Sequence, residues 1–299
     1  MLKDIRAFFD ARQVLEVETP ILGSFGVTEP ALNNMVVDTG GDRRYLQTSP
    51  EYAMKRLLSA GSGDIYQVTR AFRGAEYGTR HNPEFSILEW YRLGMDHHDL
   101  MDEVDALLME LLSNLSLRGS KRLSYREAFQ ESLDIDPVLC SETTLMELAS
   151  ERDLLPEQSL SRDDLLDLLL SMVVAKTFPE DQLSFIYDWP VSQAALARVL
   201  PDDPACAGRF EVYLGELELA NGFWELSNAD EQEQRFKLDR QERELSGLPD
   251  IEADPMLLDA LRQGLPECSG VALGLDRILM LRQGAATIND VLAFPWERS

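Results

Sequence analysis

The chain has 299 residues, of which 44% are hydrophobic and 27% are charged. This composition is typical of a globular protein and excludes an intrinsically disordered chain. The 53 acidic and 28 basic residues give a net charge of −25, which disfavours binding along a nucleic-acid backbone but permits a few arginines to hold a small anion such as ATP.

The sequence predicts neither a secretion signal nor a membrane span. Charged residues at positions 4, 6, 10 and 12 interrupt the N-terminal segment. The longest apolar run, residues 165–175, is shorter than the roughly 20 residues that a span needs and predicts a buried helix. The cysteines lack the spacing of a disulfide framework or a zinc site: they are Cys140, Cys206 and Cys268. We therefore expect a soluble cytoplasmic protein with buried, reduced thiols.

The first sixty residues predict two helices. Residues 2–13 have apolar positions at helical spacing, and residues 14–19 alternate like a strand that ends at Pro20. Ser49-Pro50-Glu51 supplies an N-cap, a proline at the first helical position and an acid in the first turn. The second helix should therefore start there and run to about residue 60, before Gly61.

The rest of the chain predicts strands flanked by helices. Residues 65–73 and 85–92 predict an antiparallel pair, and residues 270–274 predict a last strand that runs into a helix. Residues from about 96 to 200 are mostly helical and acidic in pattern, which predicts a solvated helical insertion. No repeat or linker divides the chain, so we expect one α+β domain over residues 1–299, with an antiparallel sheet flanked by helices.

An arginine ends the first strand of the antiparallel pair. Phe72-Arg73 is followed by a loop over residues 74–80 and then by His81-Asn82-Pro83-Glu84-Phe85. A guanidinium in this place matches a phosphate group in a planar fork and keeps its charge at physiological pH. The alternative that these residues leave open is a surface salt bridge from Arg73 to Glu76 or Glu84.

The second strand of the pair places a carboxylate among apolar side chains. Because side chains alternate along a strand, Glu89 shares one face with three such residues: Phe85, Ile87 and Tyr91. A buried carboxylate costs free energy unless a cation pairs with it. A ligand ammonium fits this role, and a structural arginine or lysine from elsewhere in the chain is the alternative.

Residues 210–226 return to a strand pattern that carries paired acids. If Gly215-Glu216 is the two-residue turn of a hairpin, Glu211 and Glu218 share a face. Two carboxylates there repel each other unless a cation lies between them, and Mg²⁺ held by carboxylates and substrate phosphates fits. A break at Gly222 should leave three side chains pointing together: Asn221, Phe223 and Glu225. A solvated acidic face is the alternative.

The last predicted strand has one face stripped of side chains, formed by Gly270, Ala272 and Gly274. A flat ligand can lie against such a backbone. Arg277 follows in the first turn of a helix, where a cation opposes the helix dipole, and this indicates an anionic ligand rather than packing alone. Neither a P-loop nor a GxGxxG turn occurs in the sequence.

These patches, in this order, resemble the three signature motifs of the class II aminoacyl-tRNA synthetases over nearly the whole chain. The first motif corresponds to residues 12–20, the second to residues 72–85 and the third to residues 270–277. The strings between them are similar to those of the lysine enzymes: Ser49-Pro50-Glu51, Leu88-Glu89-Trp90-Tyr91 and Asn221-Gly222-Phe223-Trp224-Glu225-Leu226. Two positions depart from the motifs. Glu76 stands one residue late in the Phe-Arg-x-Glu pattern, and Gln13-Val14 replaces a Gly-aromatic pair.

Lysyl-tRNA synthetases carry an N-terminal OB-fold that reads the anticodon, and we expect no such domain here. With the charge of −25, the chain thus resembles the truncated lysyl-tRNA synthetase paralogues that modify translation elongation factor P. The resemblance implies activation of (R)-β-lysine, or of lysine, as an adenylate and its transfer to a lysine ε-amine of that factor. It also implies ATP and Mg²⁺, a homodimer through the first motif, and no tRNA.

The same resemblance implies roles for individual residues. Arg73 and Arg277 would be catalytic, at the α- and γ-phosphates, and Glu211 and Glu218 would hold Mg²⁺. The implied ATP-binding residues are Arg73, Gly74, Ala75, Glu76, Asn82, Phe85, Glu218, Leu219, Gly274 and Arg277. The implied amino-acid-binding residues are Ser49, Pro50, Glu51, Glu89, Tyr91, Asn221, Phe223, Glu225 and Ala272.

Three questions stay open at this stage. Ala272 stands where the lysine synthetases have a glycine, and its methyl group would favour a β-amino acid over an α-amino acid. A lysine-type tRNA-charging enzyme is one alternative function. A catalytically inactive, synthetase-like regulator that binds an amino acid and a partner is another.

Overall fold

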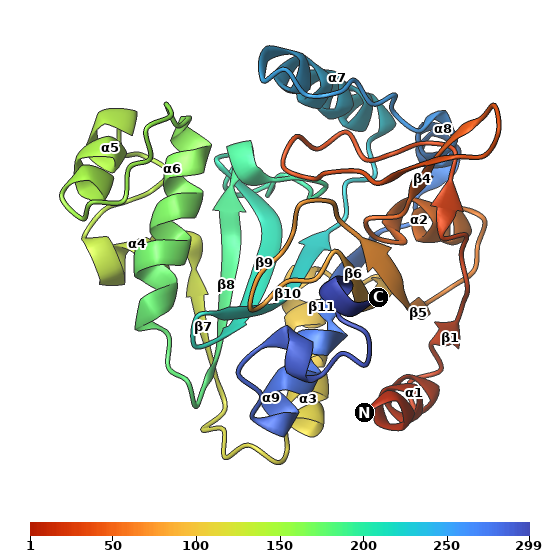
Figure 1. The fold of residues 1–299 in the computed structure, drawn as a ribbon, viewed down its shortest axis with the longest axis horizontal. Helices are drawn as coiled ribbons and strands as arrows, with labels where there is room; N and C mark the ends of the chain where they lie inside the picture. The colour runs from red at the N-terminus through yellow and green to blue at the C-terminus, as the bar shows by residue number, and fades with distance from the viewer. The chain divides into compact units, whose positions relative to one another are not determined.

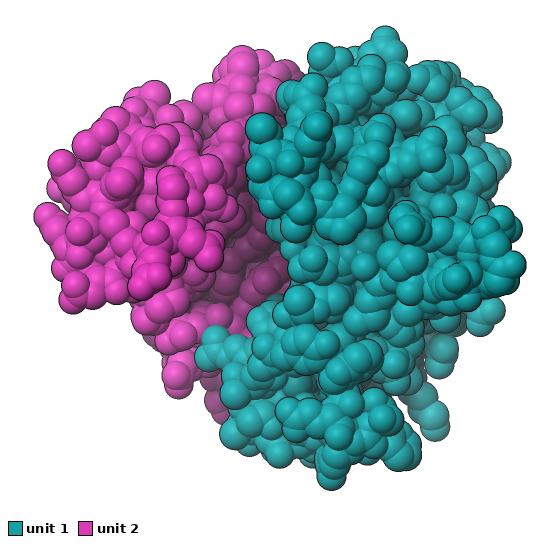
Figure 2. Space-filling view, turned by 45° about the horizontal axis from the view of Figure 1, so that its top comes forward, with its two compact units in different colours: residues 1–95, 226–299 teal, residues 96–225 magenta.

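The computed structural model describes residues 1–299, which form two compact units (Figure 2). Unit 1 comprises residues 1–95 and 226–299, and unit 2 comprises residues 96–225. Unit 2 begins where the helical insertion was expected to begin. It extends beyond residue 200 because the strands that follow pair with a strand inside it. No helix has both the length and the apolar composition required to span a membrane.

Unit 1 contains strands in the order β1-β5-β6-β11 (Figure 1). Their bounds are β1 Leu15–Glu16, β5 Ile65–Phe72, β6 Glu84–Leu93 and β11 Cys268–Gly274. The antiparallel pairing predicted for β5 and β6 is confirmed, and β11 pairs antiparallel with β6. The strand predicted over residues 14–19 is confirmed only as the short β1, which pairs parallel with β5.

Five helices and a small second sheet complete unit 1. The helices are α1 Leu2–Asp10, α2 Glu51–Ser59, α7 Ala229–Leu245, α8 Pro255–Gly264 and α9 Leu275–Gln283. The sheet has the order β2-β4-β3, with β2 Leu22–Gly23, β3 Val36–Asp38 and β4 Arg43–Leu46. The predicted helices at the N-terminus, after Ser49 and after Gly274 are confirmed as α1, α2 and α9.

Aromatic packing fixes one face of β6 in the core of unit 1. Trp90 and its β5 partner Tyr66 both contact Phe9 of α1, with ring centroids 5.4 and 4.4 Å from that of Phe9. All three side chains are buried. Because strand side chains alternate, this packing directs the neighbouring residues of β6 to the opposite face, where the predicted site lies.

Helix α1 ends in a Schellman motif with an unusual residue. Val14 N donates to Phe9 O, and Gln13 N donates to Asp10 O, which places Gln13 at the position that usually holds glycine. Gln13 has φ +58°, a left-handed conformation that costs a residue with a Cβ atom about 1–2 kcal/mol. Glycine is therefore usual at this position of the first motif because it adopts the left-handed conformation without strain.

We expect Gln13→Gly to raise the free energy of unfolding by about 0.5–1 kcal/mol, because relief of this strain outweighs the added entropy of the unfolded chain. Thermal denaturation followed by circular dichroism measures the change. Ala11→Gly is the matched control: Ala11 has an ordinary right-handed φ of −60°, so the glycine should lower stability. A Gln13→Gly chain no more stable than wild type would contradict the prediction.

Unit 2 contains strands in the order β10-β9-β8-β7 (Figure 1). Their bounds are β7 Ser120–Ser124, β8 Leu183–Pro190, β9 Cys206–Leu214 and β10 Leu217–Trp224. Neighbours pair antiparallel except for β7 and β8, which are parallel. The α+β class and the antiparallel character of the sheet are confirmed, with parallel pairing confined to β1–β5 and β7–β8.

The helices of unit 2 cover its hydrophobic core, and the sequence analysis predicted the elements of this unit only in part. They are α3 His97–Leu111, α4 Tyr125–Leu133, α5 Glu142–Ser150 and α6 Arg162–Leu169. The apolar run 165–175 is helical and largely buried, as predicted. The expectation that residues 96–200 are mostly helical missed β7 and β8, which are far apart in the sequence and pair with each other. The cysteines form no disulfide, but Cys140 is only partly buried.

Candidate active site

Strand β11 of unit 1 presents a face with almost no side chains, next to a face of β6 that carries large ones. In the β6–β11 register, Glu89 lies opposite Ala272 and Tyr91 lies opposite Gly270. Gly274 lies opposite Ile87 on the same face. The predicted bare face of the last strand is therefore confirmed, and it adjoins the face of β6 that carries the carboxylate.

Glu89 is held in place by two hydroxyl groups. Its side chain is 2% exposed, its Oε2 accepts a hydrogen bond from Ser49 Oγ at 2.7 Å, and its Oε1 accepts one from the Tyr91 hydroxyl at 2.8 Å. Burial, reinforced by the nearby charge of Glu51, raises the pKa of Glu89 to about 7. A ligand ammonium that pairs with this carboxylate would favour its ionised form.

A buried lysine that the sequence analysis did not select stands beside this carboxylate. Lys55 is 2% exposed, and its Nζ donates to Glu51 Oε1 at 2.6 Å, one helical turn earlier on α2. Its charge also lowers the pKa of Glu89. The alternative that a structural lysine compensates the charge of Glu89 is thus partly confirmed. Glu51, which was expected to bind the amino group of the substrate, already has a cationic partner in Lys55. The sequence signal that could have indicated a buried lysine is its place on the helix between two apolar residues, Met54 and Leu58.

Arg73 follows directly after β5, as predicted. Its guanidinium lies 5.1 Å from the ring centroid of Phe85, and its Nε donates to Thr48 O at 3.4 Å. Glu76 Oε1 is 3.9 Å from Arg73 Nη1, too far for a hydrogen bond. Of the two salt bridges that were the alternative for Arg73, only the one with Glu76 occurs, and it is a loose ion pair. Glu84 instead approaches Arg70, at 3.7 Å.

The shifted glutamate of the second motif has a structural explanation. Ala75 has φ +62°, so the chain makes a left-handed turn between Gly74 and Glu76. This turn accommodates the additional residue, and Glu76 lies within 3.9 Å of Arg73. The Cβ of an alanine at Gly74 would approach Asn33 O to 3.2 Å, so the backbone is closely packed at that position.

The second predicted arginine lies at the same edge of the strands as the first. Strands β5 and β11 both run antiparallel to β6, so Arg73 after β5 and Arg277 after β11 flank the start of β6. Arg277 Nη2 is 2.7 Å from His81 Nε2, and Arg277 Nε donates to Arg80 O at 3.4 Å. Asp276 anchors this corner by accepting a hydrogen bond from Ser86 N at 2.7 Å.

Asn82 has a structural role at this edge. Its amide nitrogen donates to Glu84 O at 2.5 Å, and its Oδ1 accepts from Trp296 N at 3.0 Å. Asn82 thereby ties the second motif to the C-terminal segment. Its expected place beside a nucleotide stays a prediction.

In unit 2 the paired acids lie on a hairpin with the predicted turn. Gly215, with φ +55°, and Glu216 connect β9 to β10, and Glu218 lies opposite Tyr213. A register shift between Glu218 and Ala220 then leaves Leu219 as an extra residue. The break expected at Gly222 was wrong: Gly222 lies within β10, and the irregularity occurs three residues earlier.

The bulge brings the predicted side chains to one face. Because of the register shift, Asn221 lies opposite Glu211, two residues along β9 from the Tyr213–Glu218 pair. Glu211, Glu218 and Asn221 therefore share a face, and Phe223 continues it. Glu225, one residue beyond β10, is buried.

Glu211 has two partners that the sequence analysis did not assign to it. Arg209 Nη2 donates to Glu211 Oε1 at 2.6 Å, and the Tyr213 hydroxyl donates to Glu211 Oε2. Arg209 also stacks 3.9 Å from a ring centroid of Trp189. Burial, with repulsion from Glu218 as the next cause, raises the pKa of Glu211 to about 7.

These residues fit a magnesium ion. Two carboxylates close enough to raise the pKa of one of them supply the hard oxygen ligands that Mg²⁺ prefers. Asn221 Oδ1, on the same face, is buried and accepts no hydrogen bond. A buried oxygen without a donor beside two acids is best satisfied by a cation or by a ligand N–H group.

We expect Mg²⁺ affinity to rise with pH up to about pH 7, because Mg²⁺ must displace the proton from Glu211. Below that pH the affinity should fall by roughly tenfold per unit for one displaced proton. The raised pKa has a second consequence in the absence of metal. The contribution of Glu211 to the free energy of unfolding falls as the pH rises from about 4.5 to 7. Calorimetric titration of the chain with MgCl₂ and a non-hydrolysable ATP analogue measures the slope. A slope unchanged in Glu211→Gln would contradict the assignment.

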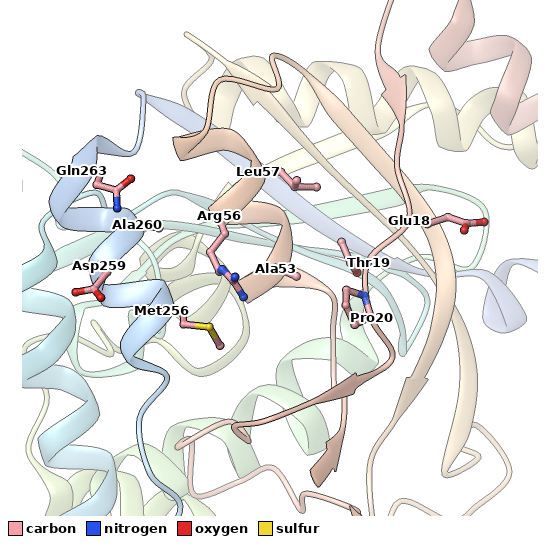
Figure 3. A pocket seen from close by; sticks show the side chains of 10 residues that line it. All are labelled: Glu18, Thr19, Pro20, Ala53, Arg56, Leu57, Met256, Asp259, Ala260 and Gln263. Atoms are coloured by element: carbon pink, nitrogen blue, oxygen red, sulfur yellow. The ribbon is translucent and has the colours of Figure 1, made fainter.

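A separate cavity in unit 1 contains none of these groups. It has a volume of about 510 Å³ and lies between α2 and α8, beside the segment that ends at Pro20 (Figure 3). Arg56 of α2 and Met256 of α8 both line it. Several large apolar side chains on this unit are exposed near the first motif: Leu15, Ile21, Leu22 and Met256.

Arg73 lies in the second of the three motifs that resemble those of the class II synthetases, and the bare strand β11 with Arg277 forms the third. The sequence profile of the class II tRNA synthetases (D, K and N) matches residues 1–298, and the chain belongs to this family. Two similar curated proteins are elongation factor P–(R)-β-lysine ligases, from Yersinia enterocolitica and Salmonella dublin. They are 48% and 47% identical to this chain over 307 aligned positions, which cover 100% of the chain and 94% of each relative.

Proposed function

We propose that the protein is an ATP-dependent ligase that activates (R)-β-lysine and transfers it to a lysine of translation elongation factor P. The full-length similarity to ligases of that name supports the substrate and the acceptor. The observation that carries the chemistry is the buried Glu89, which lies beside the bare face of β11. The same unit places Arg73 and Arg277 at one edge of these strands. This arrangement suits an amino acid with a second ammonium group and a nucleotide.

In the first step, a substrate carboxylate oxygen attacks the α-phosphorus of ATP, and the bond to the β-phosphate oxygen breaks. The products are the aminoacyl-adenylate and pyrophosphate. We propose that Arg73 holds the α-phosphate and the attacking carboxylate, and that Arg277 holds the γ-phosphate. Fixed guanidiniums stabilise the charge that develops on the phosphoryl oxygens and keep the reacting atoms aligned.

Glu211 and Glu218 would hold Mg²⁺, with Arg209 and Tyr213 orienting Glu211. Bound there, the ion would neutralise charge on the phosphates of ATP. Glu89, with Tyr91 and Glu225, would bind the distal ammonium of the substrate. A buried carboxylate discriminates strongly against amino acids that lack this ammonium, because its charge is then left without a partner.

In the second step, an uncharged ε-amine of a lysine in the acceptor protein attacks the adenylate carbonyl carbon. An amide bond forms, the bond to the AMP oxygen breaks, and the amine proton is released. Because the proposed acceptor is a translation factor, we propose that the reaction occurs in the cytoplasm. The relatives support the ligase over a tRNA-charging enzyme or an inactive regulator.

We expect Ala272→Gly to raise the use of α-lysine relative to β-lysine by about tenfold, the usual effect of one methyl group in a pocket. Ala272 lies directly opposite Glu89 in the strand register, so its methyl group occupies space beside the bound amino acid. Pyrophosphate exchange with each isomer gives the two values of kcat/KM, and their ratio within one variant is its own control. An unchanged ratio would contradict the proposed role.

A homodimer through the first motif is part of the proposal. The exposed apolar side chains near Pro20 and the cavity beside α2 and α8 are consistent with a surface that a second copy covers. Sedimentation equilibrium should give twice the mass of 33.8 kDa. A monomeric mass at micromolar concentration would remove this part of the proposal.

The decisive experiment is mass spectrometry of elongation factor P after incubation with the protein, ATP and each lysine isomer. We expect a mass increase of one lysyl residue with (R)-β-lysine, and a smaller yield with α-lysine. A parallel reaction with tRNA should give no charged product. Charging of tRNA without modification of the factor would overturn the proposal in favour of a synthetase.

A further inference from the structure

Two of the three histidines in the chain form a cluster with an aspartate in unit 2, away from the acidic hairpin face. His97 and His98 open helix α3, and their ring centroids are 4.1 Å apart. Asp188 lies on β8, and its Oδ1 is 2.8 Å from His97 Nε2. The possible ligand atoms of all three residues lie within 4.8 Å of one another.

The His97 ring is fixed by packing that leaves one nitrogen available. The side chain is 3% exposed and stacks against Trp224, with centroids 6.2 Å apart and planes at 21°. Its Nδ1 is enclosed by the backbone of Gly208, where an added Cβ would approach Nδ1 to 3.2 Å. Nε2 is therefore the nitrogen that the ring presents to Asp188.

Asp188 reaches the histidines through an irregularity in its strand. The β8–β9 register shifts between Tyr187 and Trp189, so that Asp188 lies opposite two residues of β9, Gly208 and Arg209. It has φ +58°, a conformation that is unfavourable for a residue with a Cβ atom. This left-handed conformation breaks the regular alternation of the strand at Asp188, whose carboxylate faces the imidazole of His97.

We propose that His97, His98 and Asp188 form a binding site for a divalent first-row transition metal of the zinc type. Two imidazoles and a carboxylate are a common protein ligand set for such ions, with the remaining positions filled by water. His98 and Asp188 are accessible enough for water to complete the coordination. The site does not depend on the proposed ligase activity.

The ion requires changes of about 1.5 Å or less in the separations of the ligand atoms, which lie within 4.8 Å of one another. Metal–ligand bonds of about 2.0–2.1 Å in a tetrahedral site place two ligand atoms about 3.3 Å apart. The 2.8 Å contact between His97 Nε2 and Asp188 Oδ1 needs to open by only about half an ångström.

The surrounding charges favour a cation. Asp96, which caps α3, adds negative charge next to the histidines. Arg122 also acts on His98, but Asp102 accepts a hydrogen bond from its Nη2 at 2.6 Å. A bound ion would join the first turn of α3 to β8 and, through the His97–Trp224 contact, support the end of β10.

The test uses the full chain, stripped with a chelator and titrated with Zn²⁺ alone by isothermal calorimetry. We expect one ion per chain at micromolar concentration, and at least a tenfold loss of affinity in His98→Ala. His98 is exposed, so this variant should fold, and thermal denaturation checks that it does. His81→Ala is the matched control, because it removes the remaining histidine and should leave Zn²⁺ affinity unchanged.

A second pair of variants separates this site from the acidic hairpin. Asp188→Asn should weaken Zn²⁺ binding at least tenfold, whereas Glu211→Gln should leave it intact. Visible absorption of the Co²⁺-substituted chain should report nitrogen ligands and should be lost in His98→Ala. No stoichiometric Zn²⁺ binding, binding unchanged in His98→Ala, or binding lost in Glu211→Gln would each overturn the proposal.

Discussion

Arg73→Ala should reduce ATP–pyrophosphate exchange by about 10³-fold or more, because a fixed positive charge at the reacting phosphate is among the largest contributions to phosphoryl transfer. The guanidinium lies over Phe85 at the edge of the strands, and only a carbonyl at 3.4 Å and a loose carboxylate contact engage it. It is thus preorganised for a ligand. Exchange of radiolabelled pyrophosphate into ATP with saturating amino acid measures the loss.

The chain offers a close control for this variant. Arg70 lies on β5, three residues before Arg73, is about half exposed, and forms its nearest ion pair with Glu84 at 3.7 Å. Because exposed pairs contribute little, Arg70→Ala should keep exchange within about threefold of wild type. Near-normal exchange in a folded Arg73→Ala protein would remove this residue from the mechanism.

Glu89→Gln should lower kcat/KM for the amino acid by about 10²–10³-fold while leaving the KM for ATP within about threefold. Truncating one member of a buried ion pair typically costs about 3–5 kcal/mol, because the partner charge is left uncompensated. Glutamine keeps the shape of the side chain and can still bond Ser49 and Tyr91. Exchange assays with varied amino acid and with varied ATP separate the two constants.

Glu84→Gln is the control for Glu89→Gln, since Glu84 begins the same strand but is about half exposed. It should change neither constant appreciably. Equal losses in the amino-acid and ATP constants of Glu89→Gln would assign Glu89 a structural role instead. A shift of the pH profile towards lower pH, without a loss of affinity, would likewise argue against an ion pair with the substrate.

The elements that the sequence predicts well are those with strong local signals. The start of α2 after Ser49 and the alternation along β6 follow from capping chemistry and strand periodicity, and both appear in the structure. The turn at Gly215-Glu216 was predicted for the same reason. In each case the residues within one turn or one strand determine the conformation.

The features that the sequence did not predict depend on contacts between distant segments. β7 and β8 lie sixty residues apart, and their pairing decides that both are strands. The partnership of Lys55 with Glu51 is local, but the burial of that lysine follows from packing around α2. Arg209 becomes a partner of Glu211 only because both residues are on the same face of β9 in a buried setting.

The extra residue at Leu219 decides which side chains of its strand lie beside Glu218. If the strand alternated regularly at its present length, Ala220 and Gly222 would share the face of Glu218, and Asn221 and Phe223 would lie on the opposite face. The acids would remain on the protein, but the amide and the ring beside them would be exchanged for their sequence neighbours. Removal of Leu219 alone should therefore leave Asn221 on the face of Glu218, because the remaining residues alternate regularly, whereas removal of a second residue would turn Asn221 to the opposite face.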